Sequence, residues 1–166
     1  AQQDEQRRLY RSALLWLSRR EYSSVELQRK LEQKHHQVDA SRIDELLMTL
    51  QAEGYLSDHR FAESLVRSRM QRGYGPVYIA HELSQKGVSR EIVGEVIRQD
   101  DEVWLSQAKR LVAKRSRGAP ALGDAHLQEG TETHEEPHAA AKDRQRLAQL
   151  LSRRGFPSDV IMKAIG

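Results

Sequence analysis

The sequence has 166 residues, of which 38% are hydrophobic, 31% are charged and 5% are aromatic. It contains four prolines and no cysteine, which excludes disulfides, thiol catalysis and zinc sites built on cysteine. This composition favours exposed, charge-rich helices over a compact β fold. The lack of cysteine suits a reducing compartment, and we expect neither a membrane span nor a signal peptide. We therefore expect a cytoplasmic protein without a membrane partner.

The net charge of +3 is unevenly distributed along the chain. Residues 116–141 contain one basic residue and five carboxylates, so this stretch carries a net charge of −4 and the remainder carries +7. A basic excess of this size permits contact with phosphate or with an acidic protein surface, but it requires neither.

Apolar residues recur at helical spacing along most of the chain, and no alternating pattern of strand type interrupts them. Residues 1–56 predict three helices. Their apolar stripes are Tyr10, Ala13, Leu14 and Leu17; Leu27 and Leu31; and Ile43, Leu46, Leu47 and Leu50. Ser23 and Glu26 have the spacing of a capping box at the second helix, and Gly54 ends the third.

Residues 57–100 predict a second unit of three helices. Its apolar stripes are Phe61, Ala62, Leu65, Val66 and Met70; Ile79, Ala80 and Leu83; and Ile92, Val93, Val96 and Ile97. Pro76 suits the first position of a helix, and Ser89 can cap the next one.

Residues 101–166 predict a third unit. Its apolar residues are Trp104, Leu105, Ala108, Leu111, Val112, Leu147, Leu150, Leu151, Val160, Ile161, Ala164 and Ile165. Residues 116–139 interrupt it with Gly, Pro, Thr, His and Glu in no apolar period, and we expect this insertion to be mobile.

A repeated segment supports this division. Leu83-Ser84-Gln85-Lys86-Gly87-Val88 recurs 68 residues later as Leu151-Ser152-Arg153-Arg154-Gly155-Phe156. Without the 24-residue insertion the offset is 44, which is the length of the second unit. The sequence therefore predicts an all-α fold, an elongated array of three tandem three-helix units at 1–56, 57–100 and 101–166.

Patterns typical of catalysis or metal binding are weak. His134-Glu135-Glu136-Pro137-His138 matches a zinc-protease motif, but Pro137 would break the helix that the motif needs. A polar loop is the better interpretation, and His35-His36 is better explained as a solvated pair. No nucleophile elbow or phosphate-binding loop is present. We expect no catalytic residue, no metal and no cofactor, and hence a binding protein rather than an enzyme.

The candidate partner-binding residues are basic side chains near helix ends, with one tyrosine. They are Arg67, Arg69, Arg72 and Tyr74; Lys109, Arg110 and Lys114, followed by Arg115; and Arg153 and Arg154. Tyrosine and arginine are enriched at binding hot spots, and Arg110 and Lys114 share one helical face. Simple solvation explains any single cluster, and a shared contact surface is the alternative.

Several segments resemble one known family. They are Glu53-Gly54-Tyr55-Leu56-Ser57-Asp58-His59-Arg60-Phe61-Ala62, Arg72-Gly73-Tyr74-Gly75-Pro76, Lys86-Gly87-Val88, the repeat at 151–156, and Arg19-Arg20-Glu21-Tyr22-Ser23 with Lys30-Leu31. These segments resemble the RecX family, bacterial regulators of the RecA recombinase. The resemblance implies an elongated, curved array of three three-helix repeats without catalytic activity. It also implies binding to RecA or to the RecA–single-stranded DNA filament, which restrains strand exchange and ATP hydrolysis. The insertion is longer and more acidic than the family pattern.

Three functions therefore stay open. The first is a monomeric regulator that binds the RecA filament. The second is a direct DNA-binding module, because three-helix units and basic clusters suit phosphate contacts. Against it, 19 carboxylates outside the insertion would repel phosphate. The third is a passive helical scaffold. A salt titration separates the second from the first, because binding driven by phosphate weakens steeply with salt even without RecA.

Overall fold

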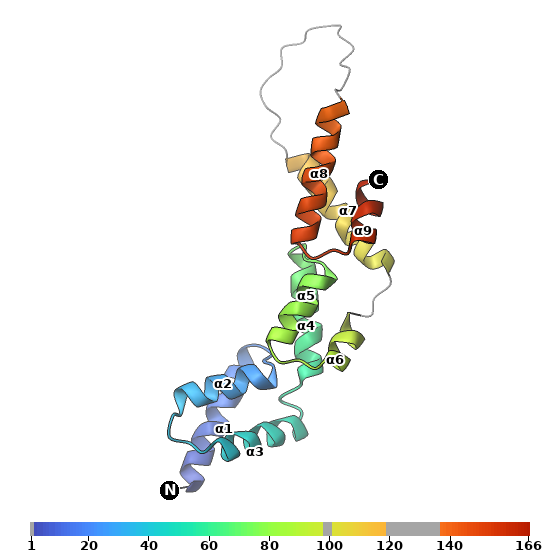
Figure 1. Cartoon of the computed structure of the whole chain (residues 1–166). Coiled ribbons are helices and arrows are strands. Elements are labelled where there is room, and N and C mark those ends of the chain that lie inside the picture. The colour runs from blue at the N-terminus through green and yellow to red at the C-terminus, as the bar shows by residue number, and fades with distance from the viewer. Residues whose placement is uncertain (1, 98–100, 119–136) are drawn as a thin grey trace. The chain divides into compact units, whose positions relative to one another are not determined.

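The computed structural model describes residues 2–97, 101–118 and 137–166, and these residues form nine α-helices and no strand (Figure 1). The helices are α1 Gln2–Arg19, α2 Ser24–Lys34, α3 Ala40–Ala52, α4 Asp58–Gln71, α5 Pro76–Gln85, α6 Arg90–Val96, α7 Asp101–Gly118, α8 Pro137–Arg153 and α9 Ser158–Ile165. The all-α prediction is confirmed.

The chain divides into two compact units, which do not follow the predicted three-unit boundaries. The first comprises Ala1–Ser68 and Ile79–Arg98, and the second comprises Arg69–Tyr78 and Gln99–Gly166. Helices α4 and α5 therefore contribute to both units. The order of the helices agrees with three successive groups of three, but the division at 56 and 100 stays a prediction.

The core of the first three helices is apolar and rich in leucine. Its buried residues are Leu9, Ala13, Trp16, Tyr22, Leu27, Leu31, Ile43, Leu46, Leu47, Leu50 and Leu56. The buried face of α1 differs from the predicted stripe, because Leu9 and Trp16 are buried while Tyr10, Leu14 and Leu17 pack at the edge of the core. Burial of this apolar surface is the main stabilising contribution in such a unit.

Four helices end in the same way, at a glycine with positive φ: Gly54, Gly73, Gly87 and Gly155. At each, the residue after the glycine donates its backbone N–H five residues back, as Val88 does to Leu83 and Phe156 does to Leu151. This is the Schellman arrangement, which satisfies the last carbonyl groups of a helix. Val88 and Phe156 are both buried, so the repeated segment ends a helix and anchors the next residue in a core.

Capping residues at helix starts agree with the sequence. The Ser23 hydroxyl accepts from the backbone N–H of Glu26 at 3.1 Å, and the Ser89 hydroxyl accepts from that of Ile92 at 3.3 Å. Pro76 is the first residue of α5. Helix α3 begins at Ala40, with Asp39 at its N-cap.

The second unit contains α7, α8 and α9, with Trp104, Ala108, Leu151, Phe156, Val160 and Ile161 buried. Its helices extend further than predicted, because α7 continues to Gly118 and α8 begins at Pro137. Three residues at each end of the predicted 116–139 insertion are therefore helical. Pro137 is compatible with this, because proline is well tolerated at the first helical position. The remainder of that insertion, residues 119–136, lies outside the described residues.

Candidate partner-binding surface

The turn between α4 and α5 positions the central candidate residues. Gly73, with φ of 85°, donates to the Met70 carbonyl at 3.0 Å, and Tyr74 donates to the Arg69 carbonyl at 3.0 Å. Pro76 then starts α5. The turn therefore closes α4 and presents Arg72 and Tyr74 at the end of that helix.

The loop that follows α8 is hydrogen-bonded to this turn. The Gly75 N–H donates to the Arg154 carbonyl at 2.6 Å, and the Val77 N–H donates to the Gly155 carbonyl at 2.9 Å. Gly155 has φ of 91°, and a side chain there would run into the backbone of Tyr78. The glycine thus allows two backbones to approach, which brings Arg154 beside Tyr74.

Arg154, Tyr74 and Tyr78 form a group of adjoining planar side chains, here called the tyrosine stack. The rings of Tyr74 and Tyr78 are 4.2 Å apart at 17° between their planes. The guanidinium carbon of Arg154 lies 4.9 Å from the centre of the Tyr74 ring, and its Nη1 donates to the Arg72 carbonyl at 3.1 Å. Stacking, cation–π contact and a charge-assisted hydrogen bond together fix the turn against the loop.

A depression of about 370 Å³ lies between the end of α4 and the middle of α7. Its lining residues, here called the basic depression, are Met70, Gln71, Arg72, Gly73, Gln107, Arg110, Leu111 and Lys114. Arg72, Arg110 and Lys114 are exposed cations. Two clusters that are distant in sequence therefore meet at one surface.

The basic depression has the chemistry of an anion-binding surface. Among the described residues that line it are three cations, two amide side chains and no carboxylate. Arginine offers a planar fork of donors that suits carboxylate and phosphate groups, and lysine adds a flexible point charge. Met70 and Leu111 supply apolar contact area. The surface can therefore bind an anionic group with an apolar neighbour.

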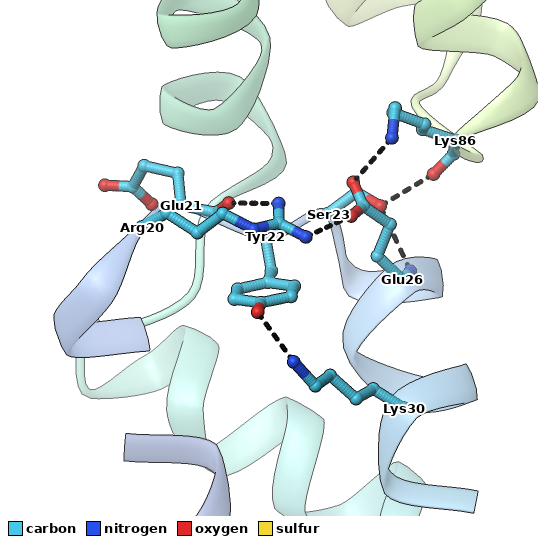
Figure 2. A network of polar contacts seen from close by, with 7 residues as sticks. All are labelled: Arg20, Glu21, Tyr22, Ser23, Glu26, Lys30 and Lys86. Carbon is cyan, nitrogen blue, oxygen red and sulfur yellow. Dashed lines mark hydrogen bonds and ion pairs between the residues drawn. The ribbon is translucent and has the colours of Figure 1, made fainter. Parts of the chain in front are cut away.

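The first unit contains a similar junction, in which two cations pair with a carboxylate of the same junction (Figure 2). The Ser23 hydroxyl donates to the Lys86 carbonyl at 2.7 Å. The Glu26 carboxylate pairs with Arg20 at 2.9 Å and with Lys86 at 3.5 Å. Arg20 also lies over the Tyr22 ring, 3.6 Å from its centre. The two cations of this junction therefore have a carboxylate partner within the protein.

The two junctions correspond residue by residue at an offset of 52 along the chain. Arg20 and Tyr22 correspond to Arg72 and Tyr74, while Glu26 corresponds to Tyr78. Lys86 and Arg154 hold the same place in the repeated loop. The second junction thus keeps the cations and has tyrosine in place of the carboxylate.

Comparisons with known proteins decide the family. Two family models match the chain: "RecX, second three-helix domain" at residues 57–97 and "RecX, third three-helix domain" at residues 134–165. Regulatory protein RecX of Halorhodospira halophila is 39% identical over 153 residues, which cover 92% of this chain and 83% of that protein. This chain belongs to the RecX family.

Further relatives agree with this assignment. Regulatory protein RecX of Legionella pneumophila (strain Corby) is 33% identical over 92% of this chain and 89% of its own length. The crystal structure of RecX from Lactobacillus salivarius has a TM-score of 0.74 at 24% identity, and the match covers 98% of this chain and 95% of that one. This structural likeness supports the fold.

The other predicted binding residues are placed as follows. Arg153 and Lys109, which precede Arg154 and Arg110 in the sequence, are exposed. Arg69 is half-buried, as its position in the apolar stripe of α4 suggests. Arg67 is exposed but belongs to the first compact unit. The structure therefore brings Arg72, Arg110 and Lys114 together and joins Tyr74 to Arg154. Whether any of them contacts a partner stays a prediction.

The sequence interpretation missed Gln71 and Gln107 as lining residues. One face of α7 carries Gln107, Arg110, Leu111 and Lys114 at helical spacing. That periodicity is the signal that could have identified Gln107.

The described residues contain no cluster of three or more potential metal ligands and no helix long and apolar enough to span a membrane. His134 of the possible zinc motif lies outside the part of the chain that the structure describes, and Pro137 begins α8.

Proposed function

We propose that this chain regulates the RecA recombinase by binding RecA or the RecA–single-stranded DNA filament, and that it thereby restrains strand exchange and ATP hydrolysis. It acts by binding and contributes no catalytic residue, metal or cofactor of its own. The observation that supports this most strongly is membership in a family whose relatives are named regulatory proteins.

We propose that the basic depression is the main contact. Arg72, Arg110 and Lys114 converge there without a neighbouring carboxylate among the described lining residues. The cations could pair with carboxylates of the recombinase or with phosphates of its DNA, and long arginine side chains suit either group. Tyr74, Arg153 and Arg154 extend this contact from the adjoining loop, and Lys109 and Arg69 flank it.

Several weak contacts along one chain can give firm attachment to a filament. A filament repeats the same surface at each subunit, so a second contact forms at a high effective concentration once the first is made. Arg67, which belongs to the other compact unit, is the candidate for such an additional contact.

Charge reversal of Arg72→Glu with Arg110→Glu tests the proposal. Co-sedimentation with RecA–single-stranded DNA filaments formed in ATP should fall well below that of the unaltered chain, and inhibition of ATP hydrolysis should weaken in parallel. The fold should survive, because surface substitutions usually change stability by about ±0.5 kcal/mol. Circular dichroism checks this.

The matched control is Arg144→Glu with Arg146→Glu. Both arginines are exposed on α8 in the same unit, outside the basic depression, and the change in net charge is identical. We expect the control to sediment with filaments like the unaltered chain. If both double variants lose binding equally, total charge and not the basic depression is responsible. Arg67→Glu alone tests the additional contact.

Direct DNA binding without RecA is the second candidate. The three cations of the basic depression favour it, whereas the modest basic excess of the chain does not. If this candidate is correct, the logarithm of the affinity for DNA alone should fall linearly with the logarithm of the salt concentration. The slope is set by the number of phosphates that the protein neutralises.

A further inference from the structure

Tyr78 is an aromatic side chain whose exposure the fold does not explain. It is 37% exposed, and Val77 beside it is 57% exposed. The Tyr78 ring lies nearly parallel to the Tyr74 ring, and Arg154 adjoins Tyr74. Of the three planar groups in the tyrosine stack, Tyr78 is the one exposed to solvent and therefore the one that another flat ring can cover.

The residue that corresponds to Tyr78 in the first junction is Glu26. The Glu26 side chain is largely buried and forms ion pairs with Arg20 and Lys86. In the second junction Tyr78 takes the place of this carboxylate, and its neutral ring does not form such ion pairs. The exchange removes a negative charge that would repel phosphate and adds a flat ring stacked on Tyr74, the ring that Arg154 contacts.

We propose that Tyr78 is a stacking platform for an unpaired nucleobase of single-stranded DNA, with Arg154 and Arg153 binding the adjoining phosphates. Aromatic rings beside cations are the usual elements of single-strand binding, because every base has a face that can stack. Arg154 uses Nη1 for the Arg72 carbonyl and retains other N–H donors for phosphate. Arg153 is exposed next to it.

The position of Tyr78 favours a base over a protein side chain. Aromatic hot spots between proteins usually occupy well-packed, desolvated pockets. Tyr78 and Val77 lie instead on the exposed first turn of α5, and neither lines the basic depression. A nearly parallel pair of rings offers a flat surface that a further planar ring extends.

This proposal does not depend on RecA, so it is tested with DNA alone. Two fluorescent strands of equal length are compared at low salt by anisotropy: one of thymidines, and one of abasic sugar-phosphates that carries the same charge. The variants are Tyr78→Ala, which removes the ring, Tyr78→Phe, which keeps it, and Val77→Ala as the matched control on the neighbouring exposed residue. Circular dichroism checks folding.

We expect Tyr78→Ala to weaken binding of the thymidine strand at least about fivefold, the lower end of what one stacked base contributes. Tyr78→Phe and Val77→Ala should bind like the unaltered chain. The abasic strand should bind to the unaltered chain about as weakly as thymidines bind to Tyr78→Ala.

Three results would overturn the proposal. The first is equal affinity of the unaltered chain for the two strands, or no measurable binding to either. The second is unchanged thymidine binding by a folded Tyr78→Ala variant. The third is a Tyr78→Ala variant that keeps strand binding but loses co-sedimentation with RecA filaments, which would assign Tyr78 to a protein contact.

Discussion

The hydroxyl of Ser23 donates a 2.7 Å hydrogen bond to the carbonyl oxygen of Lys86, 63 residues further along the chain. The same hydroxyl accepts from the backbone N–H of Glu26 and so caps α2. One fully buried side chain therefore starts a helix and holds the repeated loop of the next group of helices. In the second junction, the backbone N–H of Gly75 makes the corresponding contact with Arg154.

We expect Ser23→Ala to lower the free energy of unfolding by about 2 kcal/mol, because it removes a helix cap and leaves the part-buried Lys86 carbonyl group without its donor. Urea denaturation measures this. Ser89→Ala is the matched control, since Ser89 caps α6 through the same contact but is exposed. It should cost about 1 kcal/mol. Equal losses would show that the bond to Lys86 contributes nothing.

The close approach of Gly155 to the Tyr78 backbone gives a second prediction. Gly155→Ala should destabilise the protein by about 3 kcal/mol or more, because positive φ disfavours alanine and the methyl group meets backbone atoms. Gly54→Ala shares the positive φ but has open space around it, and should cost about 1 kcal/mol. Thermal unfolding separates the two, and equal destabilisation would mean that the contact with Tyr78 is easily relaxed.

Neighbouring arginines of the repeated loop should differ in stability. Arg154→Ala should cost about 1–2 kcal/mol, because it removes a charge-assisted hydrogen bond to Arg72 and the contact with Tyr74. Arg153→Ala should stay within about 0.5 kcal/mol, since Arg153 is exposed. The free energies of unfolding in urea test this. A loss at Arg153 as large as at Arg154 would contradict the assigned contacts.

The helical fold follows closely from the sequence where one local signal dominates. The capping serines Ser23 and Ser89, the helix stop at Gly54 and the first position of α5 at Pro76 were all predicted from local chemistry and are present. The predicted apolar stripe of α1 was incomplete, because it left out the buried residues Leu9 and Trp16. Residues 13–17 are all apolar, so periodicity alone does not distinguish the face with Trp16 from the face with Leu14.

The candidate surface was only partly predictable. Each basic cluster was visible in the sequence, but the meeting of Arg72 with Arg110 and Lys114 depends on how α4 and α7 pack. The bond from Gly75 to the Arg154 carbonyl joins residues 79 positions apart, and no local pattern specifies it. The stacking of Tyr74 on Tyr78 likewise depends on the folded turn.

Two tyrosines of the first unit should have pKa values shifted in opposite directions from the usual tyrosine value. The hydrogen bond from Tyr10 to Glu53, of 2.6 Å, together with burial and the charge of that carboxylate, raises the pKa of Tyr10 to about 12. Burial raises the pKa of Tyr22, but the hydrogen bond from Lys30 and the charges of Arg20 and Lys30 outweigh it and lower that pKa below 10.0.

The two groups therefore affect stability with opposite signs. The Tyr10 contribution is complete below pH 10 and is lost as the pH rises through about 12. The Tyr22 contribution is present above pH 10 and is lost as the pH falls through its lowered pKa. Difference titrations of phenolate absorbance for Tyr10→Phe and Tyr22→Phe should show the later and the earlier transition, respectively. The reverse order would contradict both contacts.

The most direct test of the central claim is the rate of ATP hydrolysis by RecA on single-stranded DNA as this chain is added. We predict that the rate falls with increasing concentration and saturates, and that strand exchange falls with it. The Arg72→Glu, Arg110→Glu variant should require more protein for the same effect. A hydrolysis rate that stays constant up to an excess of the folded, unaltered chain over RecA would contradict the proposed function.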